Sequence, residues 1–396
     1  MEAGRATYDA VIIGGAMMGS AVAWFLTREG FDGRIAVIER DPTYANCSTA
    51  HTNSCLRQQF STEINIRISQ FGAAYLKRFR DEMGGDDRVP HVQFDSFGYL
   101  YLADNDAKAA TLREVQALQA GLGAGTVLLT PDEIAAGFPF YNLDSIRLGS
   151  LGTRDEGYFD GTTMFEWWRR KAREAGVDYL TGEVAGIDRT ADRVTGVRLA
   201  DGSRIGTGLI VNAAGPRAAK VAGMAGIDLP VEPRKRFTWV FQAEDALGAP
   251  LPLTIDPSGV HFRSDGGNFM TGCPPDVDGP VDPDDFAMDP DIFMDKVWPA
   301  LAHRVPAFER IRVIREWAGH YAYNTLDQNA VVGPHTEVSN FHFINGFSGH
   351  GFQQAPAMGR GLAEAIVHGS YQSLDLSALG FARIAAGEPV LERAVI

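Results

Sequence analysis

The sequence predicts an α/β fold that combines a parallel-sheet domain with a second domain built on a mainly antiparallel sheet. Residues 8–13 and 35–38 are apolar, β-branched runs of the kind found in buried parallel strands, and a helical segment separates them. Residues 92–102 and 237–242 instead alternate apolar and polar side chains, as half-buried antiparallel strands do, and strand structure is expected to resume at 260–270. Both kinds of sheet are therefore expected in one chain.

Composition excludes several classes of protein. The chain has 396 residues, of which 45% are hydrophobic and 22% charged, enough to bury more than one core. The formal net charge of −14 offers no positive field for nucleic acid or an anionic membrane. Three cysteines without CxxC spacing indicate neither a disulfide framework nor a metal site. No apolar stretch reaches the ~20 residues of a bilayer-spanning helix, and no signal peptide is recognised, so a cytoplasmic location is expected.

The first strand runs into a glycine-containing turn that opens a helix. Gly14 permits a sharp turn, the small Ala16 lets backbone approach a ligand, and Gly19 allows tight packing of helix on strand. The pattern GxAxxG also occurs in purely structural turns, but Glu39 ends the second strand at the position of a ribose-binding carboxylate. A Rossmann-type dinucleotide site is predicted, for FAD or NAD rather than NADP, and its first expected contacts are Gly14, Ala16, Met17, Met18, Gly19, Glu39 and Arg40.

The chain after Arg40 favours FAD over NAD, because residues 41–54 leave the strand-helix alternation that an NAD dehydrogenase would continue. This polar segment is either an ordinary loop or a source of hydrogen-bond donors to phosphate or flavin. A second buried strand, residues 209–212, ends in small residues where backbone can lie against a flat ligand. The contacts expected from these stretches are Ser48, Thr49, Asn53, Ser54, Val184, Ala214 and Gly215.

The third piece lies near the C-terminus, where a strand at residues 341–345 leads into a glycine-rich turn at 346–352 and a helix at 355–368. The amides at the start of that helix would stabilise negative charge that develops at N1 and O2 of a reduced flavin. The expected flavin contacts here are Gly349, His350, Gly351, Phe352 and Gln353.

These three pieces, in this order and spacing, resemble the D-amino-acid oxidase and glycine/sarcosine oxidase family of FAD enzymes. Residues 295–329, 353–356 and 374–377 further resemble the subgroup that contains a mitochondrial FAD-dependent oxidoreductase domain protein linked to complex I assembly. The resemblance implies a discontinuous FAD-binding domain at 1–88, 148–229 and 320–396. Residues 89–147 and 230–319 would form the substrate-binding domain, whose antiparallel sheet roofs the flavin.

The family oxidises amines by hydride transfer to flavin N5, and the resulting imine is hydrolysed. A substrate carboxylate needs a cation in such a pocket, and Arg57 stands where the family places an arginine; the alternative is a surface arginine at a helix start. A further candidate for this cation is one of Arg234, Lys235 and Arg236, if it faces the cavity. Alternatively, the three residues lie in a solvated turn. The resemblance also implies that His320, Tyr321, His350 and Gln353 reach the flavin or substrate, His350 as a positioning group and not a base.

Three departures from the sarcosine oxidase pattern refine this expectation. His320 replaces the cysteine that links flavin covalently, so noncovalent FAD is expected. Gln353 replaces a lysine that helps to bind substrate carboxylate. Either other residues bind the carboxylate here, or the substrate differs. Met270 replaces a lysine that promotes the reaction of reduced flavin with oxygen, so a slower reaction with oxygen is expected. The electron acceptor is then either oxygen or a quinone or electron-transfer protein.

The expected activity is oxidation of a secondary or tertiary amine, an N-substituted glycine such as sarcosine or iminodiacetate. Two alternatives stay open. One is a dehydrogenase of D-amino acids or cyclic imino acids. The other is a flavoprotein that acts mainly in assembly or partner binding, in which FAD would be structural.

Overall fold

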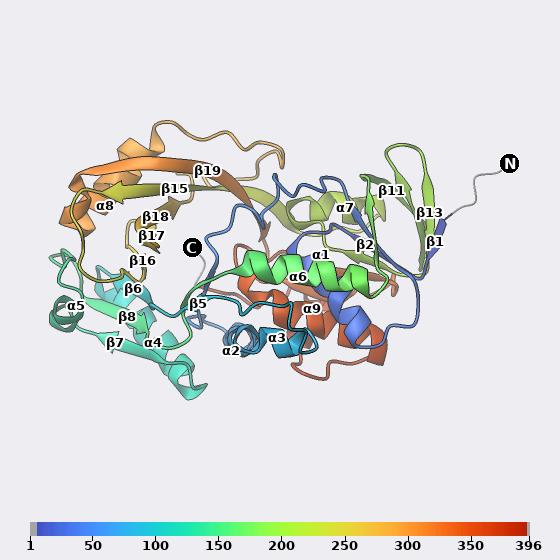
Figure 1. The fold of residues 1–396 in the computed structure, drawn as a ribbon, viewed down its shortest axis with the longest axis horizontal. Helices are drawn as coiled ribbons and strands as arrows, with labels where there is room; N and C mark the ends of the chain where they lie inside the picture. Colours follow the sequence, from blue (N-terminus) through green and yellow to red (C-terminus); the bar gives the residue numbers. More distant parts are fainter. Residues whose placement is uncertain (1–5, 394–396) are drawn as a thin grey trace.

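The computed structural model describes residues 6–393 and has two parts that lie side by side (Figure 1). Helices packed on a six-stranded sheet form the part at the right of Figure 1, and an eight-stranded sheet forms the part at the left. The predicted segments 1–88 and 320–396 also contain residues 1–5 and 394–396, which lie outside the described residues. Among residues 6–393, none of the helices combines the length and hydropathy needed to cross a membrane.

The six-stranded sheet is parallel except at one edge. Its strands, from edge to edge, are β10 (Asp178–Thr181), β3 (Ile35–Glu39), β2 (Ala10–Ile13), β14 (Ile210–Asn212), β21 (Phe341–Asn345) and β20 (Val331–Pro334), of which β20 runs antiparallel to β21. Separate stretches of the chain thus contribute to one parallel sheet, whose strands end at a common edge. The α/β prediction with a Rossmann-type sheet is confirmed.

Helices follow the strands as the sequence predicts. α1 (Met17–Arg28) begins just after β2, and α9 (Gly351–His368) begins six residues after β21. The two helices pack closely, because a Cβ on Gly359 of α9 would lie only 2.7 Å from the Cβ of Ala21. The other helices of this part are α2 (Glu63–Lys77), α3 (Phe79–Glu82), α6 (Gly161–Glu174), α7 (Ala218–Met224) and α10 (Phe381–Ala386), with short turns η1 (Gly215–Arg217) and η4 (Ser377–Leu379).

The eight-stranded sheet is antiparallel except for the pair β16 and β6. Its order is β19 (Ile311–Asn324), β15 (Val231–Ala243), β18 (Asn268–Cys273), β17 (His261–Asp265), β16 (Leu253–Ile255), β6 (Tyr99–Ala103), β8 (Leu148–Gly152) and β7 (Thr126–Leu129). Its helical elements are α4 (Asp106–Gly121), α5 (Pro131–Gly137), η2 (Phe293–Val297), α8 (Trp298–Arg304) and η3 (Pro306–Glu309). β15 and β19 pair along almost their whole length and extend towards the parallel sheet (Figure 1).

Two small sheets complete the fold. The first contains β1 (Ala6–Tyr8), β13 (Arg204–Thr207), β12 (Val194–Leu199) and β11 (Val184–Arg189). The second contains β4 (Cys55–Leu56), β9 (Gly157–Phe159) and β5 (Phe94–Asp95). β4 matters for the site, because Arg57 follows it directly.

The structure differs from the predicted elements at three places. The strand expected at 92–102 is broken into β5 and β6, since Gly98 adopts φ +97° between them. The stretch 260–270 is a hairpin of β17 and β18 that turns at Gly266, where φ is +60°. α9 starts at Gly351 and not at 355, so the glycine-rich turn itself enters the helix. Both β8 and β19 belong to the eight-stranded sheet, although β8 lies in the segment 148–229 expected for the FAD-binding domain and β19 crosses the expected limit at 320. The division into domains stays a prediction.

Candidate cofactor and substrate site

A large cavity lies at the ends of the parallel strands and under the antiparallel sheet, with an empty volume of about 2160 Å³ that includes open solvent. It brings together the predicted residues from all three pieces of the chain. Those that line it are Gly14, Ala16, Met17, Met18, Glu39, Arg40, Ser48, Thr49, Asn53, Ser54, Arg57, Val184, Ala214, Gly215, His320, Tyr321, Gly349, His350, Gly351, Phe352 and Gln353. Gly19 is not among the lining residues.

The two glycines of the first turn have different structural tasks. Gly14 has φ +98°, and a Cβ there would lie 2.5 Å from the carbonyl oxygen of Ala213. A Cβ on Gly19 would lie 1.8 Å from the carbonyl oxygen of Gly14, so Gly19 lets α1 pack against the turn. Gly19 therefore shapes the site from behind and does not face the cavity.

The start of α1 leaves a favourable position for a phosphate. The first turn of the helix carries no acidic residue, and its N-cap position, Ala16, makes no side-chain hydrogen bond. Glu39 lies beside this turn: its carboxylate accepts hydrogen bonds from the backbone amides of Gly15 and Asp41, both at 2.8 Å. A pyrophosphate at the helix start and a ribose near Glu39 fit these residues.

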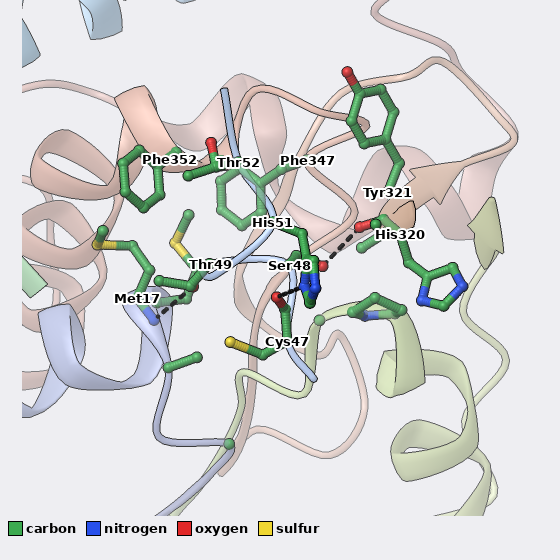
Figure 2. A pocket seen from close by; sticks show the side chains of 18 of the residues that line it. Met17, Cys47, Ser48, Thr49, His51, Thr52, His320, Tyr321, Phe347 and Phe352 are labelled. Atoms are coloured by element: carbon green, nitrogen blue, oxygen red, sulfur yellow. Dashed lines mark hydrogen bonds between the residues drawn. The ribbon is translucent and has the colours of Figure 1, made fainter. Parts of the chain in front are cut away.

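The polar segment after β3 lies along the cavity (Figure 2). The Ser48 hydroxyl donates to the carbonyl oxygen of His320 at 2.6 Å, and the Thr49 hydroxyl accepts from the amide of Met17 at 3.3 Å. The segment is thus tied to both α1 and β19, which an ordinary surface loop would not be. Of its other predicted residues, Ser54 donates to the carbonyl oxygen of Phe159 at 2.6 Å.

The glycine turn before α9 reaches the same cavity. A Cβ on Gly349, where φ is +94°, would lie 2.4 Å from the Tyr321 ring, so only a glycine leaves room for this ring. The Met18 side chain comes within 2.9 Å of the Cβ position of Gly351, which places the starts of α1 and α9 next to each other. The first turn of α9 also carries no acidic residue. Its positive end suits the electron-rich edge of a reduced flavin.

Arg57 is buried, with only 1% of its surface exposed, and its guanidinium contacts His350 and Tyr101. Because a guanidinium only donates, the Nε2 atom of His350, 2.8 Å from Arg57 Nη2, accepts this hydrogen bond. Burial and the neighbouring charge of Arg57 hold the pKa of His350 well below 6.5, so the ring is neutral. Gln353 accepts from the backbone amide of Arg57 at 2.8 Å. The surface-arginine alternative for Arg57 does not fit this burial.

His320 lines the same cavity and packs against the loop at 276–291. Its Nε2 atom is 2.9 Å from the carbonyl oxygen of Asp285, and its ring packs on Phe286 at 4.5 Å. Burial lowers its pKa from the ordinary value of 6.5. The neighbouring Tyr321 contacts a cation, since the Arg236 guanidinium stacks over its ring at 4.5 Å.

Of the three basic residues before the roof strand, Arg236 lines the cavity, whereas Arg234 and Lys235 do not. Arg236 forms two hydrogen bonds with the Asp278 carboxylate, at 2.8 and 2.9 Å. Met270, expected near the oxygen site, is buried but does not line the cavity, and its sulfur lies 3.4 Å from Arg263 Nη2. The prediction about oxygen reactivity stays untested.

Several cavity residues were not predicted from the sequence. Tyr99 on β6 and His261 on β17 line the roof, and burial together with Arg236 and Arg263 lowers the pKa of His261 to about 4. The Asn53 amide joins this roof, since its Nδ2 lies 2.8 Å from His261 Nε2. A lone histidine in a strand carries no sequence signal for a cavity. The spacing of Tyr99 and Tyr101 only indicates one face of a strand.

The loop at 276–291, between β18 and η2, also closes the cavity from outside. Pro283 and Phe286 line the cavity, and the Asp284 carboxylate binds both Arg40, at 2.8 Å, and Arg217. The loop thereby connects the end of β3 with η1 across the expected nucleotide site.

We expect Asp284→Ala to release FAD about fivefold faster, which corresponds to ~1 kcal/mol for partly exposed ion pairs. High salt should speed release from the unchanged protein and have little further effect on the variant. Stopped-flow recovery of flavin fluorescence measures this rate. Asp291→Ala, an exposed change in the same loop, is the matched control. Equal rates for both variants would show that the Asp284 pairs do not retain the cofactor.

Comparisons with known proteins agree with this geometry. A family model described as "FAD dependent oxidoreductase" (DAO) matches residues 9–365. The chain is 40% identical to "FAD-dependent oxidoreductase domain-containing protein 1" of Xenopus laevis, over 98% of this chain and 85% of that protein. It is 26% identical to "Sarcosine oxidase subunit beta" of Rhizobium meliloti, over 92% and 86% of the two chains.

Among solved structures, L-proline dehydrogenase from P. horikoshii superposes with a TM-score of 0.85 at 27% identity and covers 97% of this chain and 100% of that one. The family predicted from the three sequence pieces is confirmed. With the strand-turn-helix, the polar segment and the glycine turn around one cavity, the chain belongs to the DAO family of FAD-dependent oxidoreductases.

Proposed function

We propose that the protein oxidises a secondary or tertiary amine that bears a carboxylate, such as an N-substituted glycine of the sarcosine or iminodiacetate type. The product is an imine, which water hydrolyses to a smaller amine and a carbonyl compound. The observation that carries the proposal is the buried guanidinium of Arg57, which lines the cavity beside the start of α9.

Each neighbouring residue has a task in this proposal. Arg57 binds the substrate carboxylate through charge-assisted hydrogen bonds. Neutral His350 holds one side of the guanidinium, and Gln353 holds the backbone amide of Arg57. Gln353 thus positions the arginine, where a lysine at 353 would have bound the carboxylate itself.

FAD, when bound, accepts the hydride that the substrate carbon loses. The residues that would hold it are the lining residues of the α1 and α9 turns, the segment 48–54, and Val184, Ala214 and Gly215. We propose noncovalent binding, since His320 stands in place of the linking cysteine and its ring contacts Asp285 and Phe286. The electron acceptor and the expected cytoplasmic location stay predictions.

A second candidate is oxidation of a cyclic imino acid. The similarity to L-proline dehydrogenase, with a TM-score of 0.85 over 97% of this chain, favours it. Proline and sarcosine are both α-carboxylates with a secondary amine, so Arg57 would serve either substrate. The alternative of a flavoprotein that acts mainly in assembly or partner binding differs from both, because it predicts that no amine is turned over.

Anaerobic reduction of the bound flavin tests the proposal. Purified holoprotein is mixed with sarcosine, N,N-dimethylglycine, iminodiacetate, L-proline or D-proline, and the flavin band near ~450 nm is followed. Bleaching by an N-alkyl glycine supports the first candidate, and bleaching by a proline alone supports the second. If no amine reduces the flavin, the enzymatic proposal fails and the assembly role gains support.

A further inference from the structure

A buried carboxylate, Glu156, lies behind the segment that carries Arg57 and takes no part in the reaction proposed above. Only 1% of its surface is exposed. Its Oε1 atom accepts from the backbone amides of Gln58 and Gln59, at 2.6 and 3.1 Å, and its Oε2 atom accepts from the Gln59 side-chain amide at 2.9 Å. Because all three partners donate, this arrangement suits an ionised carboxylate.

The backbone around Glu156 provides the space for this carboxylate. A Cβ on Gly152 of β8 would lie 1.7 Å from Glu156 Oε2, so a side chain at 152 would displace it. Gln59 is held from two further sides: the Ser150 hydroxyl donates to its Oε1 at 2.8 Å, and its Nε2 donates to the Tyr99 carbonyl oxygen at 2.7 Å. Glu156 therefore belongs to a buried network centred on Gln59.

That network ends at the guanidinium in the cavity. Arg57 Nη1 donates to the backbone carbonyl oxygen of Gln59 at 3.1 Å. We propose that Glu156 is a positioning residue for substrate-carboxylate recognition: by fixing Gln58 and Gln59, it sets where the Arg57 guanidinium lies in the cavity. This inference rests on the proposed function, because only a carboxylate-bearing substrate needs Arg57.

The position of Glu156 makes this support dependent on pH. Burial raises the pKa of its carboxyl group to about 7, while the Gln58 and Gln59 hydrogen bonds and the charge of Arg57 oppose the shift. Below pH 7 the group gains a proton, which has no place among three donors. Carboxylate binding should therefore be strong above pH 7 and weaken as the pH falls through that value.

Other ionisable groups also lie near Glu156. Burial raises the pKa of Tyr99 on β6, and the pKa of His350, beyond Arg57, is well below 6.5. The charged neighbours are the guanidinium groups of Arg57 and Arg154. Asp155, directly before Glu156 in the chain, is ion-paired with Lys77 at 2.6 Å on the outside.

Binding of methoxyacetate to the holoprotein tests the proposal without turnover. This ether has the carboxylate of sarcosine but no amine to titrate, and its binding is followed through the flavin spectrum between pH 5.5 and 8.5. We expect the unchanged protein to bind it about tenfold more weakly at pH 5.5 than at pH 8.5. Glu156→Gln, which imitates the protonated group, should bind at every pH as weakly as the unchanged protein does at pH 5.5.

Ser150→Ala is the matched control, because it removes a neutral donor to Gln59. Its affinity should fall by a similar factor at all pH values, so that its pH profile stays parallel to that of the unchanged protein. A flat profile in the unchanged protein, or an unchanged profile in Glu156→Gln, would overturn the role of Glu156. If methoxyacetate binding is instead insensitive to Arg57→Ala, the proposed function itself fails, and the two failures are distinguishable.

Discussion

Replacing Arg57 with alanine is expected to raise KM for carboxylate-bearing amines about 30- to 1000-fold, since ~2–4 kcal/mol of charged hydrogen bonding is lost. Neutral amines of the same size should lose much less, because they make no such contact. The comparison is measured as kcat/KM for N-alkyl glycines against their amides.

Two variants make the Arg57 result interpretable. Arg57→Lys keeps the charge but not the bidentate fork, and should recover part of the lost affinity. Arg234→Ala removes a cation on β15. The Arg234 guanidinium stacks on Tyr323 at 3.8 Å and does not line the cavity. This variant should leave the discrimination between acids and amides unchanged. Equal losses for acids and amides in Arg57→Ala would remove Arg57 from carboxylate binding.

Gly14→Ala is expected to abolish stoichiometric FAD binding. The new Cβ would lie 2.5 Å from the carbonyl oxygen of Ala213 at a residue with φ +98°, so the turn and the end of β14 must move apart. Both elements line the nucleotide end of the cavity. We expect FAD affinity to fall by more than about 100-fold, because the phosphate amides lose their arrangement. Fluorescence titration of the apoprotein with FAD measures this change.

Gly30→Ala is the control for backbone strain. Gly30 has φ +83° just beyond the other end of α1, and nothing lies within 4 Å of its Cβ position. This change should cost about 1 kcal/mol of stability and leave FAD binding intact. If Gly14→Ala behaves like Gly30→Ala and still binds FAD normally, the turn is not the pyrophosphate site.

The parts of the fold that the sequence predicted are local. β2, the turn at Gly14 and α1 are adjacent in the chain, so composition and glycine spacing suffice to predict them. β21 and the start of α9 are likewise adjacent. That these separate pieces join in one discontinuous domain followed from the resemblance, which also placed Arg57 near flavin or substrate.

The unpredicted parts of the site depend on contacts between distant residues. Glu156 meets Gln58 across 98 positions in the chain, and Asp284 meets Arg40 across 244. In the sequence alone, Glu156 and Asp284 look like ordinary surface acids. Only the pairing of β4 with β9 brings Glu156 behind Arg57, and no periodicity in the sequence encodes that pairing.

The central claim is that the first turn and the glycine turn before α9 bind one FAD in a single cavity. The flavin content of the folded protein, measured by absorbance before and after denaturation, tests it most directly. The account predicts one FAD per chain that denaturation releases into solution. A folded protein that is colourless and leaves the fluorescence of added FAD unchanged would contradict it.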